Sequence, residues 1–293
     1  MKERTFISFD WAIKKVLRHK ENFKVLEGFL SELLGFDITI ESLLESESNK
    51  QYDEDKYDRV DILVKSASNE LMLIEVQYDD EIDYFHRMVF GISKLITEYI
   101  SEGQPYGEIK KAYSINIMYF RLGQGKDYVY EYEGKFVGRK QKDVLNPTKT
   151  QKAKYGIETV ADIFPKYYII RVGSFKEEVQ DTLDEWIYFL KKSEIKDNFK
   201  AKGMQEAQKV LRYENMSPED QLAYKRHVEN KRLEISVTET ALYKGERRNS
   251  IKVAQKLLKK GFSLEEVAEV SELTTLEIQA IARGEDIDKE DED

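Results

Sequence analysis

The 293-residue chain contains no cysteine, which excludes disulfide bonds, thiolate zinc sites, iron–sulfur clusters and cysteine nucleophiles. It has only three histidines, far apart in the sequence, so we expect no histidine-rich metal site. Four prolines and fifteen glycines exclude a collagen-like or linker-dominated chain. No apolar run reaches the length that a transmembrane helix needs, and residues 1–15 lack the hydrophobic core of a secretory signal. We therefore expect a cytoplasmic protein with no membrane partner.

The composition that remains is 41% hydrophobic and 35% charged, which is typical of a globular protein with a very polar surface. The net charge of −9 disfavours non-specific binding to nucleic acid. The charge is unevenly distributed, because residues 194–260 hold 16 Lys and Arg against 10 Asp and Glu, whereas the last nine residues hold seven acids. An acidic chain can therefore still carry a basic region.

Hydrophobic periodicity predicts an α/β protein with a mixed sheet and helices on its faces. Apolar runs predict strands at residues 37–44, 57–65, 71–78, 112–120, 128–132 and 167–172. Apolar residues at helical spacing predict one or two helices within residues 9–34, and further helices at 80–102 and 174–191. The predicted sheet therefore lies wholly within the first two thirds of the chain.

Strand signals become scarce after residue 192, and we divide the chain there. We expect a core at 1–192, a helical connector at 193–250, a small helical module at 251–284 and an acidic disordered tail at 285–293. Capping-box patterns begin at Ser263 and Thr274, so the module resembles a helix-turn-helix. This module either reads DNA or mediates packing or dimerisation, and we favour packing or dimerisation. We therefore expect a homo-oligomer, with a dimer as the simplest form.

The two predicted strands around residues 66–70 place two carboxylates opposite each other. If residues 66–70 form a five-residue hairpin loop, the residue numbers of two facing positions add up to 136. Asp61 then faces Glu75, with Cβ atoms roughly 4.5–5.5 Å apart. Gln77 lies on the same strand face as Glu75. Opposed like charges destabilise a strand pair, and a divalent cation held by oxygen ligands relieves this, with the carbonyl of Val76 as a further ligand. The alternative is an exposed Glu75 and an Asp61 paired with Arg59 or Lys65.

These residues, set in DRVDILV and LMLIEVQ, resemble the PD-(D/E)XK nuclease superfamily, and more closely its recombination-promoting nuclease and transposase branch. That branch tends to carry Glu-x-Gln in place of Glu-x-Lys. The opening segment FDWAIKKVL resembles the family's first helix motif, matching at Asp10 and Lys14, although Ile13 stands where an aromatic is usual. The segment from Phe85 to Tyr106 and the C-terminal run AQKLLKKGFSLEEVAEVSEL also resemble this branch.

The resemblance implies a restriction-endonuclease-like fold with an all-helical C-terminal extension, and metal-dependent hydrolysis of DNA phosphodiester bonds. In this interpretation Asp61 and Glu75 hold Mg²⁺, with Mn²⁺ or Ca²⁺ as alternatives, and Gln77 orients a water molecule. Gln77 cannot supply the positive charge of the usual lysine.

Three further residues have open roles. Asp10 either completes the metal shell or is a helix N-terminal acid stabilised by the helix dipole. Lys14 either supplies the missing charge and contacts DNA or is a solvated helix residue. Arg87 either contacts phosphate or pairs with Asp83 at helical spacing.

Three hypotheses of different classes follow. The leading one is a divalent-metal-dependent DNA endonuclease. The second is a catalytically weak DNA-binding or assembly protein on a nuclease scaffold, favoured by Gln77 and by the negative net charge. The third is an oligomeric interaction protein without a nucleic-acid role.

Overall fold

The computed structural model describes the chain except residues 1–5, 14–16, 45–58, 100–103, 286 and 288–293. The described part divides into two compact units, Met1–Ser217 and Pro218–Asp293. The first unit contains the whole sheet and also residues 193–217, which the sequence analysis assigns to a connector. These residues belong to the first unit because helix α6 (Met204–Val210) packs against helix α2 (Phe23–Leu34).

A six-stranded mixed sheet forms the centre of the first unit, in the order β1-β2-β3-β4-β6-β5. β1, β2 and β3 are antiparallel neighbours, β3, β4 and β6 run parallel, and β5 is antiparallel to β6. The strands are β1 Ile40–Leu44, β2 Arg59–Ser66, β3 Leu71–Gln77, β4 Ala112–Met118, β5 Val129–Tyr132 and β6 Lys166–Arg171. All six lie within three residues of the predicted bounds.

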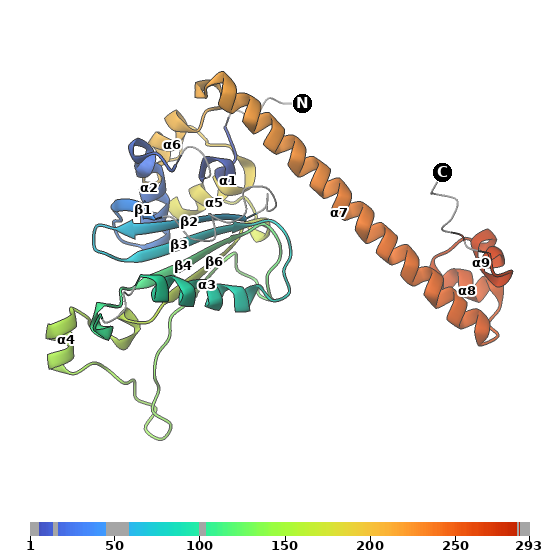
Figure 1. The fold of residues 1–293 in the computed structure, drawn as a ribbon, viewed down its shortest axis with the longest axis horizontal. Helices are drawn as coiled ribbons and strands as arrows, with labels where there is room; N and C mark the ends of the chain where they lie inside the picture. Colours follow the sequence, from blue (N-terminus) through green and yellow to red (C-terminus); the bar gives the residue numbers. More distant parts are fainter. Residues whose placement is uncertain (1–5, 14–16, 45–58, 100–103, 286, 288–293) are drawn as a thin grey trace. The chain divides into compact units, whose positions relative to one another are not determined.

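Helices cover both faces of this sheet (Figure 1). α3 crosses one face, where Ile92 and Leu95 pack on Leu63, Leu71 and Ala112. α1, α2 and α5 lie on the other face, where buried aromatic rings of α1, α2 and α5 pack edge to face. Because both faces are covered, every residue of β4 is buried, which explains its mostly apolar sequence. This is the predicted mixed sheet flanked by helices.

Helices α1, α2, α3 and α5 of the first unit fall in the predicted helical segments, whereas α4 was not predicted. Their bounds are α1 Phe9–Trp11, α2 Phe23–Leu34, α3 Tyr84–Glu98, α4 Lys149–Tyr155, α5 Thr182–Lys192 and α6 Met204–Val210. The helix predicted at 174–191 begins only at Thr182. Phe175, in extended conformation, is buried, and the Asp181 side chain caps α5 by accepting from the Asp184 backbone N–H.

Two glycines let α2 and α6 approach closely. A Cβ atom at Gly28 would lie 2.2 Å from the carbonyl oxygen of Lys202, and one at Gly203 would lie 2.7 Å from that of Lys24. Gly203 also has a φ of +78°, a conformation that favours glycine. Backbone contact therefore joins these two helices in the layer that contains α1.

The second unit is helical, as predicted. α7 spans Pro218–Lys259, and its end packs with α8 Leu264–Ser271 and α9 Thr275–Ala282 around Ala254, Val267 and Ile278. Both predicted capping boxes are present, at Ser263 with Glu266 and at Thr274 with Glu277. Most of the predicted acidic tail lies outside the described residues. Among the helices that the structure describes, none is long and apolar enough to cross a lipid bilayer.

Candidate active site

The β2–β3 hairpin has the predicted register. Asp61 faces Glu75, with Arg59 opposite Gln77 and Lys65 opposite Leu71. Glu75 and Gln77 therefore lie on one face of β3, and across the parallel pair Glu75 faces Asn116 of β4. The side chain of Asp61 lies outside the described part of the structure, and the register pairs its backbone position with Glu75.

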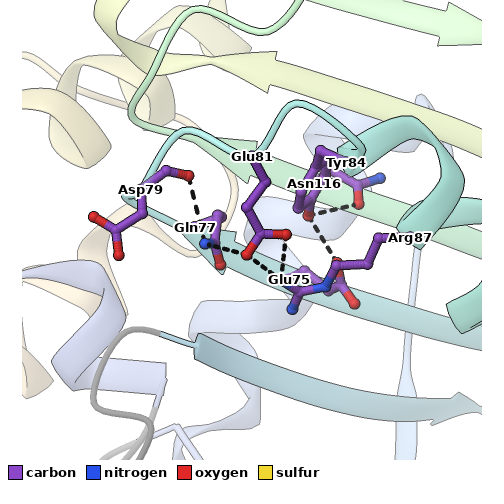
Figure 2. Close-up of polar contacts among 7 residues, drawn as sticks. All are labelled: Glu75, Gln77, Asp79, Glu81, Tyr84, Arg87 and Asn116. Carbon is purple, nitrogen blue, oxygen red and sulfur yellow. Dashed lines mark hydrogen bonds and ion pairs between the residues drawn. The ribbon is translucent and has the colours of Figure 1, made fainter.

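Glu75 is buried beneath the first turns of α3, with 6% of its surface exposed. The hydroxyl of Tyr84, the first residue of α3, lies 2.7 Å from Glu75 Oε2 and 3.2 Å from Asn116 Oδ1 (Figure 2). A phenol has one hydrogen, so it donates to one acceptor at a time, and the shorter bond to the carboxylate is the stronger. Tyr84 therefore positions one oxygen of Glu75.

Asn116 is itself held in place at the centre of the sheet. It is fully buried, and its Nδ2 donates to Ser114 Oγ at 2.9 Å and to the carbonyl of Tyr168 at 3.0 Å. These bonds orient Oδ1 toward Tyr84. The Tyr84–Glu75 contact thus rests on polar groups from β3, β4 and β6, which are rigid elements.

Glu81, in the connection between β3 and α3, links Gln77 to Arg87. Gln77 Nε2 donates to Glu81 Oε1 at 3.2 Å, and Arg87 Nη1 lies 3.0 and 3.1 Å from the two Glu81 oxygens (Figure 2). Burial lowers the pKa of Arg87, but the charges of Glu75 and Glu81 outweigh it and the pKa is raised overall. Arg87 therefore forms an ion pair with Glu81 and not with Asp83, which was one of the two partners suggested by the sequence.

Asp10 lies where β3 and β4 end. It is 1% exposed, and it lies near the stacked rings of Tyr78 and Tyr119, whose centroids are 4.1 Å apart. Burial raises the pKa of Tyr78 well above its ordinary value, and the nearby Tyr119 and Asp10 raise it further. Asp10 is the acidic residue in the first turn of α1, the position that a helix dipole favours. Its expected role in the metal shell stays a prediction.

The remaining predicted site residues are less defined. Lys14 lies outside the described residues. Val76 is in the interior of β3, and the role of its carbonyl as a metal ligand stays a prediction. Among the side chains that the structure describes, no group of three or more His, Asp or Glu residues is placed to hold a metal ion. The expected site also requires the side chain of Asp61, which lies outside the described part of the structure.

Sequence reasoning missed Glu81, Tyr84 and Asn116. Asn116 carried a signal, because it is a polar residue in the apolar run AYSINIM, and a buried amide needs partners. Glu81 carried no periodic signal, because it lies in the irregular segment before α3.

In a comparison with known protein families, the model of the PD-(D/E)XK nuclease family transposase matches residues 7–155. The matched segment contains β1 to β5, the β2–β3 hairpin and every residue of the candidate site. Comparison with curated proteins and with solved structures gave no match. The mixed six-stranded sheet with flanking helices is a restriction-endonuclease-like fold. The chain belongs to the PD-(D/E)XK nuclease family transposases.

Proposed function

We propose that this protein is a divalent-metal-dependent DNA endonuclease of the recombination-promoting, transposase-associated type. The observation that carries the proposal is the register that pairs Asp61 with Glu75 on neighbouring central strands. Family membership supports nuclease chemistry, and the buried, oriented carboxylate of Glu75 supports a preorganised site.

The chemistry of the donor set fits a hard divalent cation. Asp61, Glu75 and the carbonyl of Val76 offer only oxygen atoms, which suit Mg²⁺, Mn²⁺ or Ca²⁺. We assign these three residues to the ion and regard Mg²⁺ as the physiological choice. When bound, such an ion polarises the scissile phosphate and lowers the pKa of a water molecule.

The other residues of the site position the reactants. Gln77 donates through Nε2 to Glu81, so its amide oxygen is the group that accepts a hydrogen bond from the attacking water and orients it. Tyr84 prevents rotation of the Glu75 carboxylate. Asp10 completes the metal shell, and Lys14 supplies the positive charge that Gln77 lacks. Arg87 leaves its ion pair with Glu81 when DNA binds and contacts a DNA phosphate instead.

A plasmid assay tests the function. The wild-type protein should convert supercoiled DNA to nicked and linear forms with Mg²⁺ or Mn²⁺, and should leave it intact in EDTA.

A second candidate function is that of a DNA-binding protein with feeble catalysis. It is favoured by Gln77 in place of lysine and by the ion pair in which Glu81 neutralises Arg87. Retention of DNA without strand scission at any of the metals would support the second candidate and reject the first.

The Tyr84→Phe variant tests the positioning of Glu75. Removing the hydroxyl frees the carboxylate to rotate, so the Mg²⁺ concentration for half-maximal cleavage should rise about 10- to 100-fold, as is common for groups that orient metal ligands. The rate at saturating Mg²⁺ should change much less, and a metal titration of the cleavage rate measures both quantities.

The matched control is Tyr106→Phe, because Tyr106 is 88% exposed and its hydroxyl makes no hydrogen bond among the described residues. Its metal titration should match that of the wild type. A Tyr84→Phe variant that is slower by the same factor at every Mg²⁺ concentration would contradict the positioning role.

A further inference from the structure

The connection between β5 and β6 carries a concentrated positive charge. Residues 135–154, called the basic arm below, hold seven Lys and Arg and a single Asp in a chain whose net charge is −9. The basic residues are Lys135, Arg139, Lys140, Lys142, Lys149, Lys152 and Lys154. Although the net charge of the chain is negative, this region is positively charged, as the binding of a polyanionic substrate requires.

The arm begins with a short antiparallel hairpin whose tip is basic. Val137 pairs with Val144, and the Leu145 N–H donates to the carbonyl of Phe136 at 3.0 Å. Arg139, Lys140 and Lys142 lie at the tip. All three are exposed, and none forms an ion pair with a residue that the structure describes. Their charges are available to a ligand.

A second basic element, helix α4, follows the hairpin. Its start is defined by a capping box between Thr148 and Gln151, and Lys149, Lys152 and Lys154 lie along it. Lys152 is partly neutralised, because its Nζ lies 2.8 Å from Glu158 Oε2. The basic side chains at the hairpin tip, unlike Lys152, are therefore not neutralised by a carboxylate among the described residues.

The base of the arm is anchored to the sheet. The rings of Phe136 and Phe164 pack edge to face with centroids 5.4 Å apart. Lys111, directly before β4, donates to the carbonyls of Ala161 at 2.6 Å and Phe164 at 2.8 Å. These contacts give the arm a fixed origin, and Figure 1 shows it extending from the sheet away from α2 and α5.

The connection that carries the arm enters the sheet close to the level of Glu75. After the arm, residues 155–165 lead into β6 at Lys166, whereas Glu75 is aligned through Asn116 with Ile169, three residues further along β6. That separation is roughly 10 Å along the strand. A duplex carries one phosphate charge per about 1.7 Å of its axis, so a duplex that extends beyond the candidate site offers many further phosphates to basic side chains outside that site.

We propose that the basic arm is a DNA-binding element that holds the phosphate backbone of a duplex through Arg139, Lys140 and Lys142. This inference rests on the proposed function, which makes DNA the substrate. Lysine and arginine contacts to phosphate are independent of sequence, so the arm contributes affinity and orientation rather than base selection. A two-stranded ribbon of this kind also has the dimensions of the major groove.

The test is equilibrium binding of a fluorescent 30-base-pair DNA duplex in EDTA, where cleavage plays no part. The triple variant Arg139→Gln, Lys140→Gln and Lys142→Gln should bind at least tenfold more weakly near 0.1 M salt. The plot of log affinity against log salt should become shallower by between about 1 and 3, since each lost phosphate contact contributes about 0.9.

The matched control neutralises three exposed lysines of the α2 and α6 layer and its connection, in the variant Lys24→Gln, Lys200→Gln and Lys209→Gln. It changes the net charge by the same amount and should bind like the wild type. Equal losses in both triple variants, or wild-type binding by the arm variant, would overturn the inference. A loss for duplex RNA but not for duplex DNA would overturn the assignment to DNA.

The outcomes separate the arm from the catalytic proposal. A wild-type protein that binds the duplex but never cleaves it contradicts the endonuclease and leaves the arm intact. A protein that cleaves DNA while its arm variant binds normally contradicts only the arm. Thermal unfolding of both triple variants should match that of the wild type, because all six side chains are exposed.

Discussion

An Asp61→Ala variant is expected to lose plasmid cleavage by roughly 10³-fold or more. Asp61 faces Glu75 across the hairpin, and the two carboxylates together are proposed to hold the cation. Charge stabilisation by such an ion contributes several kcal/mol to the transition state, and each 1.36 kcal/mol corresponds to tenfold in rate. The measurement is the initial rate of loss of supercoiled plasmid at saturating Mg²⁺.

The stability of the same variant distinguishes a metal ligand from a structural residue. In EDTA, Asp61→Ala removes one of two like charges opposed across a strand pair, so the melting temperature should stay the same or rise slightly. Addition of Mg²⁺ should stabilise the wild type and leave the variant unchanged, because a ligand that binds only the folded state raises its stability. A large fall in melting temperature in EDTA would instead identify a structural role.

Asp80→Ala is the matched control for this experiment. Asp80 is an exposed carboxylate in the connection that follows β3, so its removal changes the charge near the site without touching the hairpin pair. Its cleavage rate and Mg²⁺ stabilisation should equal those of the wild type. Equal losses in both variants would show that general electrostatics, and not ligation by Asp61, control the activity.

The β2–β3 pairing could be predicted from the sequence because a hairpin has few degrees of freedom. Once the apolar runs define two strands and the polar loop between them has five residues, the register follows from the loop length. The structure has that register from Arg59 opposite Gln77 to Lys65 opposite Leu71. The capping boxes at Ser263 and Thr274 were equally predictable, because they depend on residues three positions apart.

The polar contacts around Glu75 could not be predicted in the same way. The predicted helix began at residue 80, which would place Glu81 within its first turn, whereas α3 begins at Tyr84. The irregular segment before α3 brings Glu81 within hydrogen-bond distance of Gln77. No periodic pattern of apolar residues indicates the conformation of this segment. Tyr84 reaches Asn116 across 32 residues of sequence, so their contact depends on how α3 packs on the sheet.

The second prediction with a large effect concerns the fold that supports the site. A Gly28→Ala variant should lose at least about 3 kcal/mol of unfolding free energy, at the upper end of the usual cost of overpacking. Its Cβ would lie 2.2 Å from the carbonyl oxygen of Lys202, a contact that requires the backbone to move. Native proteins are stable by about 5–15 kcal/mol, so the loss is a large share of the total.

The backbone at Lys202 cannot shift without breaking other contacts. Its carbonyl accepts a hydrogen bond from Nε1 of the fully buried Trp186 at 3.2 Å, and its N–H donates to Glu32 Oε1 at 2.8 Å. Moving this segment away from α2 therefore leaves the buried indole N–H of Trp186 without its partner, which adds to the steric cost. The measured quantity is the midpoint of urea unfolding, which should fall with an unchanged slope.

Gly134→Ala is the matched control within the same unit. A Cβ atom there would have its nearest neighbour, Tyr132 Oη, at 3.6 Å, an ordinary van der Waals contact, and the position does not have a positive φ. The variant should unfold at the wild-type urea concentration or slightly above it, because alanine restricts the unfolded chain. If Gly28→Ala unfolded there too, the backbone contact between α2 and α6 would be refuted. A Gly28→Ala protein that lost both stability and cleavage, while Asp61→Ala lost only cleavage, would separate the scaffold from the chemistry that it supports.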